Sequence, residues 1–312
     1  MYDIYIMSMG NLFHYSEQKN ILDCCVLSDL IYQTDRYVDK LYELATSKMM
    51  NTNNKRHIVN DSDGVQKDFF ELLGRLKKRP NLYKSNIQIG QLDVDVHWGF
   101  FRFSDKLVLS YQGTHDIHEI IDDLDIKQVE FINDDIFVHE GFLKSFDTSL
   151  CIVEKYILDF VSSHPNDKIY ITGHSLGGAT ATLATAYLMD KHKDITINCV
   201  TFGCPKIGDK NFVAYFSELV KSNIQFINEE DIVPTLPPLP DYYLLFPRYV
   251  IKDKYITKDN YRHREGNMIF DFIKKIFGFG GLSPISMHHC DNYLCDLKHA
   301  YMDLFIKLNE DE

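Results

Sequence analysis

One pentapeptide carries residue types that could perform nucleophilic chemistry. Residues 173–177 read GHSLG, a G-x-S-x-G pattern, which follows the apolar run Lys168–Thr172 and precedes a segment of small residues. A serine hydroxyl attacks well only when a base lies beside it and when a sharp strand-to-helix turn exposes it. The N-terminus of the following helix adds partial positive charge where an oxyanion would form. The pattern therefore predicts Ser175 as a nucleophile, with the backbone N–H of Leu176 as one oxyanion donor.

A serine of this kind works with an acid and a histidine that follow it in the chain, in that order. Three acids follow the predicted strand 224–227: Glu229, Glu230 and Asp231. Four histidines lie further downstream: His263, His288, His289 and His299. The chemistry of the side chains alone leaves both choices open.

The elements around these residues alternate between strands and helices. Apolar runs predict a hairpin over 94–103 and 106–111, and strands over 168–172, 195–202 and 224–227. Helical spacing predicts helices over 145–163, 178–190 and 210–221, and in parts of residues 22–44 and 65–76, whereas the polar stretch 51–63 predicts a loop. Such alternation predicts an α/β fold with a mostly parallel central sheet and helices on both faces.

Composition limits the classes of function and the compartment. The chain has 312 residues with a net charge of −12, which does not suit general nucleic-acid binding. Its first residues lack the pattern of a secretory signal, and glycines and threonines interrupt the uncharged run 169–189, so no membrane span is predicted. Seven cysteines cannot all pair within one chain. Together these features predict an intracellular, cytoplasmic protein with free thiols, at most peripheral on membranes.

The cysteine spacing does not suggest a metal site. Cys199/Cys204 and Cys290/Cys295 are four residues apart, a spacing that fits zinc ribbons poorly. Residues 288–290, His-His-Cys, could bind a metal by residue type, but no second cluster of ligands accompanies them in the sequence. No metal is therefore predicted.

Several linked motifs resemble the class 3 lipase family, the α/β-hydrolases that include fungal triacylglycerol lipases. In chain order the motifs are Tyr111–Thr114, His139–Phe142, Thr172–Ala179, Thr201–Pro205, Lys206–Asp209, Asn228–Pro234 and Leu236–Pro238. The resemblance covers about residues 96–295 and is densest over 107–240. It implies an α/β-hydrolase domain over 96–312 with an insertion at about 241–285. Residues 1–95 would form a mainly helical N-terminal extension packed on the core.

The resemblance also assigns site residues. The family's D-x-V-P pattern selects Asp231 as the acid. A histidine shortly before Tyr-Leu selects His288 as the base, with His289 as the remaining alternative. Thr114 becomes the second oxyanion donor, beside Leu176. The chemistry of such a triad requires no metal and no organic cofactor.

Two further segments carry expectations about surfaces. Ile117, Ile120, Ile121 and Leu124 share one helical face, and in the family this segment is a lid over the site. Residues 267–279 predict a second amphipathic helix, which docks on the core or lies on a membrane. Residues 116–135 hold eight acids and one lysine, whereas residues 248–275 hold eight basic groups and four acids. We therefore expect the basic segment to make any contact with an anionic membrane.

The predicted function is hydrolysis of carboxylic esters of a lipid-like substrate, of the triacylglycerol or diacylglycerol lipase type. The expected partners are the lipid or ester substrate and, transiently, a membrane or lipid-droplet surface, with no nucleic acid. The alternatives are a phospholipase or acyltransferase with the same triad, or a lipase-like scaffold that binds a protein and has little activity. The sequence does not predict the oligomeric state.

Overall fold

A nine-stranded sheet runs through the part of the chain that the computed structural model describes. The described residues are 13, 15–33, 57–59, 87–92, 96–103, 105–114, 127–252, 255–259 and 288–300. In spatial order the strands are β1 (His57–Val59), β2 (Ile87–Leu92), β3 (Val96–Arg102), β4 (Lys106–Tyr111), β7 (Lys168–His174), β8 (Ile197–Phe202), β9 (Asn223–Asn228), β10 (Arg248–Lys252) and β11 (Tyr255–Asp259). A separate hairpin consists of β5 (Gln128–Phe131) and β6 (Asn133–His139).

The centre of the sheet is parallel and its edges are antiparallel. Strands β4, β7, β8, β9 and β10 run in one direction, while β1 to β3 and β11 join through antiparallel pairs. Gly173 of β7 pairs with Tyr111 of β4 on one side and with Thr201 of β8 on the other. Since parallel strands end at one edge, the residues that follow β4, β7, β8 and β9 gather there.

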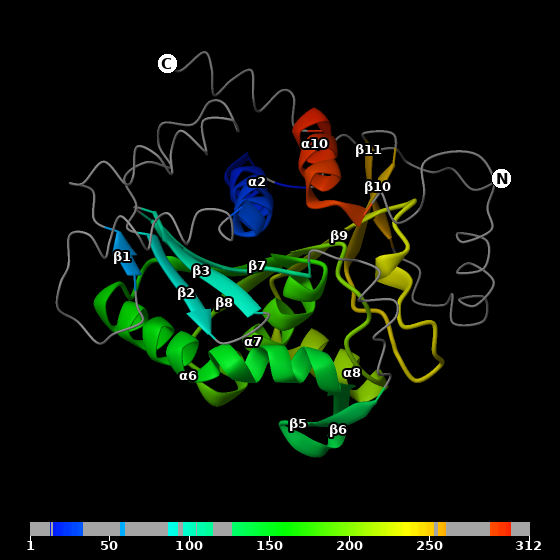
Figure 1. The fold of residues 1–312 in the computed structure, drawn as a ribbon, viewed down its shortest axis with the longest axis horizontal. Coiled ribbons are helices and arrows are strands. Elements are labelled where there is room, and N and C mark those ends of the chain that lie inside the picture. The colour runs from blue at the N-terminus through cyan, green and yellow to red at the C-terminus, as the bar shows by residue number, and fades with distance from the viewer. Residues whose placement is uncertain are drawn as a thin grey trace.

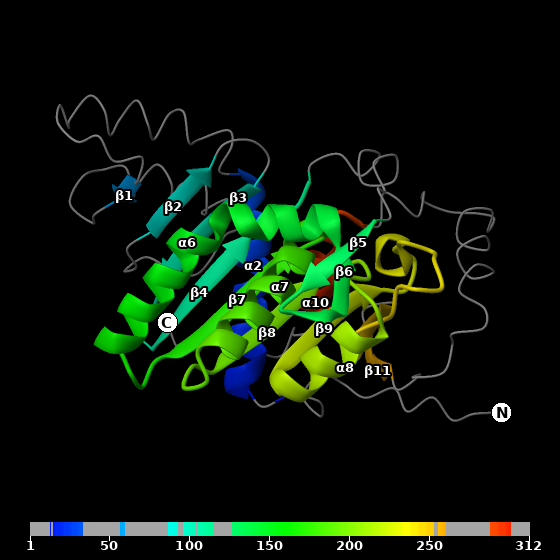
Figure 2. The same cartoon turned by 90° about the horizontal axis from the view of Figure 1, so that it is seen from below.

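Helices cover both faces of the sheet (Figures 1 and 2). One face carries α6 (Glu140–Ser163), α7 (Leu176–Lys191) and α8 (Lys210–Leu219), whose apolar residues form one core cluster with the sheet. The other face carries α2 (Tyr15–Leu30), which continues into the short η1 (Ile31–Gln33), and α10 (Cys290–Ala300). The helices α2 and α10 pack on each other and on the sheet through a second cluster.

Helix α7 is buried although it is rich in threonine. The hydroxyls of Thr180, Thr182 and Thr185 donate to backbone carbonyls four residues earlier, at 3.1, 2.8 and 2.8 Å. These hydrogen bonds satisfy the polar atoms, so the helix can pack inside the protein without exposing them to water. Within the described ranges, no helix has the length and hydropathy needed to span a membrane.

Helix α2 is joined to the sheet by buried polar contacts. The Lys106 ammonium on β4 donates to Asp23 Oδ2 at 2.6 Å and to Asn20 Oδ1 at 2.5 Å. The side chains of Lys106 and Asp23 are only 4% and 2% exposed. Asn20 also donates through Nδ2 to the Tyr170 hydroxyl of β7 at 2.8 Å. The N-terminal helix is therefore tied to β4 and β7 by paired, desolvated groups as well as by apolar contact.

The predicted α/β-hydrolase architecture is confirmed, including the hairpin β3–β4 and the alternation β7–α7–β8–α8–β9. Strand β1 falls within the polar stretch 51–63, where we expected a loop; Ile58 and Val59 are β-branched and pair with β2 instead. The lid segment 117–124 and the amphipathic segment 267–279 lie outside the described residues. The division into a helical extension over 1–95 and a hydrolase domain over 96–312 stays a prediction.

Substitution of Asp23 tests the buried ion pair. We expect Asp23→Ala to lower the free energy of unfolding by about 3–5 kcal/mol, because it leaves a buried ammonium without its counter-charge. Urea denaturation measures the change. Lys193→Ala is the control. Lys193 forms an exposed ion pair with Asp190 at 2.8 Å, with 68% of the lysine side chain exposed. We expect loss of this pair to lower the free energy of unfolding by less than about 1 kcal/mol. Equal losses in the two variants would contradict the role given to the buried pair.

Candidate active site

Ser175 occupies the sharp turn between β7 and α7. Its backbone has φ 60° and ψ −130°, a conformation that a residue with a side chain rarely adopts. The Ser175 N–H donates to the Phe202 carbonyl at the end of β8, at 3.0 Å. This strained turn places the serine at the edge where the parallel strands end, as the GHSLG pattern predicts.

The two glycines of the motif are required by close packing. A Cβ atom on Gly173 would lie 2.3 Å from the backbone of Gly177. A Cβ atom on Gly177 would lie 2.2 Å from the Tyr111 carbonyl oxygen of β4. Only glycine fits both positions, because real Cβ contacts are much longer than these distances. The start of α7 can therefore pack directly against β4 and β7.

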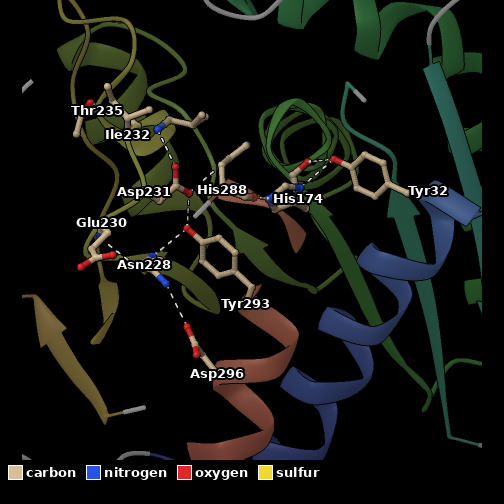
Figure 3. A network of polar contacts seen from close by, with 11 residues as sticks. Tyr32, His174, Asn228, Glu230, Asp231, Ile232, Thr235, His288, Tyr293 and Asp296 are labelled. Atoms are coloured by element: carbon tan, nitrogen blue, oxygen red, sulfur yellow. Dashed lines mark hydrogen bonds and ion pairs between the residues drawn. The ribbon is translucent and has the colours of Figure 1, made fainter. Parts of the chain in front are cut away.

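Asp231 and His288 lie against each other, although 57 residues separate them in the chain (Figure 3). His288 Nδ1 is 2.7 Å from Asp231 Oδ2, and the two side chains are 1% and 0% exposed. Asp231 follows strand β9, and His288 precedes helix α10. A carboxylate only accepts hydrogen bonds, so Nδ1 carries the proton of this bond and Nε2 of the neutral ring is left as an acceptor.

Two more groups hold the Asp231 carboxylate. The Tyr293 hydroxyl of α10 donates to Oδ2 at 2.6 Å, and the backbone N–H of Val233 donates to Oδ1 at 2.8 Å. The Tyr293 hydroxyl also accepts from the backbone N–H of Asn228 at 2.9 Å. Val233 begins the short helix η4 (Val233–Thr235). With His288 included, three hydrogen-bond donors thus orient the carboxylate.

The rival residues for the acid and the base lie elsewhere. Glu229 and Glu230 are exposed, and Glu229 pairs with Lys252 at 2.6 Å. His289 is exposed, in contrast to its buried neighbour His288. His299 lies on α10, and residue 263 lies outside the described residues.

The serine hydroxyl and the free nitrogen of His288 are both available for chemistry. Within the described part of the chain, Ser175 Oγ and His288 Nε2 are buried and have no hydrogen-bond partner. The ring of His174, the residue before the serine, lies 4.5 Å from the ring of His288 between centroids. An unpartnered hydroxyl and an unpartnered imidazole nitrogen are the atoms that nucleophilic catalysis by serine uses.

The loop after β4 lies on the turn of Ser175. A Cβ atom on Gly113 would be 2.5 Å from the His174 carbonyl oxygen and 3.1 Å from Ser175 Cβ. Thr114, the next residue, is half-buried, and Leu176 is the first residue of α7. The first N–H groups of a helix lack partners inside it. Gly113, the neighbour of Thr114 in the chain, therefore lies against the serine turn that Leu176 follows, and the roles of Thr114 and Leu176 as oxyanion donors stay predictions.

Gly203 is a site residue that the motif analysis did not single out. It follows β8 with φ +59°, and a Cβ atom there would lie 3.0 Å from both Asp231 Oδ2 and His288 Cε1. The absence of a side chain lets the acid and the base approach the end of β8. The motif analysis did not single out Tyr293 either, although it lies in the tripeptide Asn-Tyr-Leu shortly after His288. Gly203 lies inside the motif Thr201–Pro205, and Tyr293 is the tyrosine of the Tyr-Leu pair that selects His288, so both positions carried a signal in the sequence.

The described surroundings of the cysteines contain no cluster of metal ligands. No group of three or more His, Cys, Asp or Glu side chains with metal-binding geometry occurs among the residues with a described placement. Burial raises the pKa of the Cys199 thiol to about 11, so this sulfur stays protonated at neutral pH and is a poor metal ligand.

The parallel sheet, the two helical layers and the strand–serine–helix turn together make up the α/β-hydrolase fold. Residues 108–240 match the family model described as Lipase (class 3), which confirms the resemblance to class 3 lipases. The chain is 30% identical over 115 residues to a protein named Secreted mono- and diacylglycerol lipase 1 from Fusarium solani, covering 34% of each chain. It is 37% identical over 107 residues to a lipase from Rhizomucor miehei, covering 32% of this chain and 29% of that one. The chain thus spans about a third of the length of these relatives.

A solved structure of Rhizomucor miehei triacylglyceride lipase shares the fold. It superposes with a TM-score of 0.61 at 21% identity, covering 86% of this chain and 97% of that one. The similarity of fold therefore extends well beyond the segment in which the sequences align.

The prediction of a cytoplasmic, intracellular protein is corrected by these relatives. The Fusarium solani protein is named as secreted, whereas the prediction rested on the odd number of cysteines together with the lack of a secretory-signal pattern in the first residues. No disulfide joins any of the seven cysteines in the described structure, and five of them are buried. A buried thiol packs like a small apolar side chain in any compartment, so its presence does not fix where a protein resides.

Removal of the Tyr293 hydroxyl tests the support of Asp231. We expect Tyr293→Phe to slow the labelling of Ser175 by a fluorophosphonate by about three- to tenfold, because one charge-assisted hydrogen bond to the carboxylate is lost. Gel-based rates of labelling measure the effect. Tyr170→Phe removes another buried phenol hydroxyl, bonded to Asn20, and should label at the wild-type rate. Identical rates in all three proteins would contradict the role of Tyr293.

Proposed function

We propose that this protein is a serine-dependent carboxylic ester hydrolase that acts on lipid-like esters. The observation that carries the proposal is the buried Asp231–His288 hydrogen bond of 2.7 Å, with His288 in contact with His174, the residue before a serine held at a strained strand-to-helix turn. The free nitrogen of His288 and the hydroxyl of Ser175 are both unpartnered among the described residues. The match to the class 3 lipase model over 108–240 supports the same reaction.

In the proposed first half-reaction, Ser175 Oγ attacks the ester carbonyl while its proton passes to His288 Nε2. Asp231 keeps the histidine oriented and stabilises the imidazolium that forms. The backbone N–H groups of Leu176 and Thr114 donate to the oxyanion of the tetrahedral intermediate. The C–O bond to the alcohol then breaks, and His288 returns the proton to the leaving alcohol.

The second half-reaction repeats these steps with water. His288 takes a proton from a water molecule as the water oxygen attacks the acyl-enzyme carbonyl. The intermediate collapses, the ester bond to Ser175 breaks, and the serine oxygen recovers its proton from the histidine. The products are a carboxylic acid and an alcohol, and atoms balance without a cofactor.

The proposed substrates are acylglycerols or similar lipid esters. The relatives from Fusarium solani and Rhizomucor miehei are named as lipases, although this chain covers only about a third of each. The apolar residues at helical spacing over 117–124 fit a surface that meets lipid aggregates. We therefore also propose transient contact with a membrane or lipid-droplet surface.

Substitution of Ser175 tests the proposed ester hydrolase activity. We expect wild-type protein to label with a fluorophosphonate and to hydrolyse esters, and Ser175→Ala to lose both, with kcat lower by about 10⁴-fold or more. Hydrolysis of short soluble esters and of emulsified long-chain esters is compared in the same assay. A higher rate on the emulsion would support lipid surfaces as the site of action. Absence of labelling in wild type, or equal labelling of Ser175→Ala, would refute the hydrolase.

Substitution of the adjacent histidines, His288 and His289, tests which of them is the base. We expect His288→Ala to lower kcat/KM by about 10⁴-fold, because His288 is the histidine that hydrogen-bonds the Asp231 carboxylate. His289 is exposed, so His289→Ala should change kcat/KM by no more than about twofold. Both variants are compared by circular dichroism to establish that they fold. The reverse order of losses would move the role of the base to His289.

A further inference from the structure

Tyr32, which lies in η1 after the N-terminal helix, reaches the residue before the nucleophile. Its hydroxyl is 2.9 Å from His174 Nδ1 and 3.4 Å from the His174 carbonyl oxygen, and the two rings meet edge-on with centroids 5.7 Å apart (Figure 3). The two residues are 142 positions apart in sequence. The N-terminal segment thus contributes a side chain to the candidate active site.

The other nitrogen of His174 holds the main chain of His288. His174 Nε2 is 2.6 Å from the His288 carbonyl oxygen. A carbonyl oxygen only accepts, so Nε2 carries the proton and Nδ1 accepts from the Tyr32 hydroxyl. Burial, and then electrostatic repulsion of a second positive charge by the neighbouring His288 ring, lower the pKa of His174 well below its usual value. His174 is therefore neutral near pH 7, in the single tautomer that both contacts require.

The Tyr32 hydroxyl also meets the loop that carries Thr114. The backbone N–H of Gly113 donates a hydrogen bond to this hydroxyl. A Cβ atom on Gly113 would lie 2.3 Å from the Tyr32 oxygen, so the contact depends on glycine at this position. One phenol oxygen consequently joins the loop after β4 to the turn that carries Ser175.

We propose that Tyr32 and His174 are positioning residues of the ester hydrolase site. The chain of hydrogen bonds from Gly113 through Tyr32 and His174 to His288 fixes three parts of the site relative to one another: the oxyanion loop, the serine turn and the segment of the base. The inference rests on the proposed function, and it assigns a role in that reaction to a side chain from the first 33 residues. Neither residue exchanges a proton with the substrate.

The expected effect is on the rate of the chemical steps. Catalysis by oriented groups is sensitive to small displacements, and an error of 1 Å can cost about 100-fold. Loss of one hydrogen bond in this series loosens the alignment of Thr114 and His288 with Ser175, while all three residues remain in place. The variants should therefore lower kcat and leave KM for a short soluble ester nearly unchanged.

The first test compares two tyrosines that bond across the same layers. Tyr32→Phe should lower kcat about tenfold with KM changed by less than about twofold. Tyr170→Phe is the matched control, because the Tyr170 hydroxyl accepts from Asn20 of α2 at 2.8 Å and likewise joins the N-terminal helix to β7. It should lower the midpoint of thermal unfolding by at least as much as Tyr32→Phe, yet keep the wild-type kcat.

The second test asks whether Tyr32 and His174 act through the same series of hydrogen bonds. His174→Gln keeps an amide donor directed at the His288 carbonyl and should retain more activity than His174→Leu, which keeps none. Adding Tyr32→Phe to His174→Leu should lower kcat by less than about twofold further, because His174→Leu already interrupts the series of hydrogen bonds.

The outcomes separate this inference from the proposed function. Wild-type protein that neither labels nor hydrolyses esters overturns both. Active wild type with an equally active Tyr32→Phe overturns only the positioning role. Equal losses of kcat in Tyr32→Phe and Tyr170→Phe, or losses that multiply in the double variant, also overturn it, because they would show general destabilisation or independent action.

Discussion

The fully buried carboxylate of Asp231 is the group on which the arrangement of the site depends. A charge removed from water is tolerated only when it is paired and hydrogen-bonded. Here the partners come from the His288 ring, the Tyr293 hydroxyl and the Val233 backbone. All three follow Asp231 in the chain, and two of them belong to α10 or to the residues just before it, so this C-terminal helix must dock before the acid is satisfied.

The layer formed by α2 and α10 makes that docking possible. Phe202 and Phe226 stack on the sheet with planes 9° apart, and Tyr293 of α10 meets Phe202 edge-on. Helix α2 packs beside α10 on this aromatic surface and is tied to β4 through Asp23 and Lys106. The same layer supplies Tyr293 and His288 from one end of the chain and Tyr32 from the other (Figure 3). Packing on this face of the sheet therefore serves the site directly.

The opposite face supplies the strained turn. Ser175 keeps its positive φ because the glycines on either side allow α7 to lie against β4 and β7. Strain of this kind persists only where the surroundings determine the backbone fully. The buried threonines of α7 satisfy their own hydroxyls within the helix, which lets this uncharged segment occupy the core.

The sequence by itself determined the features that are local. The strand, the GHSLG turn and the small-residue helix are contiguous, so their pattern predicts Ser175 and the alternation of β7, α7, β8, α8 and β9. Asp231 and His288 were named through family motifs. The tertiary structure decided which histidine faces the acid, since adjacent side chains point in different directions: His288 inward and His289 to solvent. It alone brought Tyr32 to the site and gave Tyr293 and Gly203 their contacts with Asp231, because contacts between distant residues leave no periodic or compositional trace in the chain.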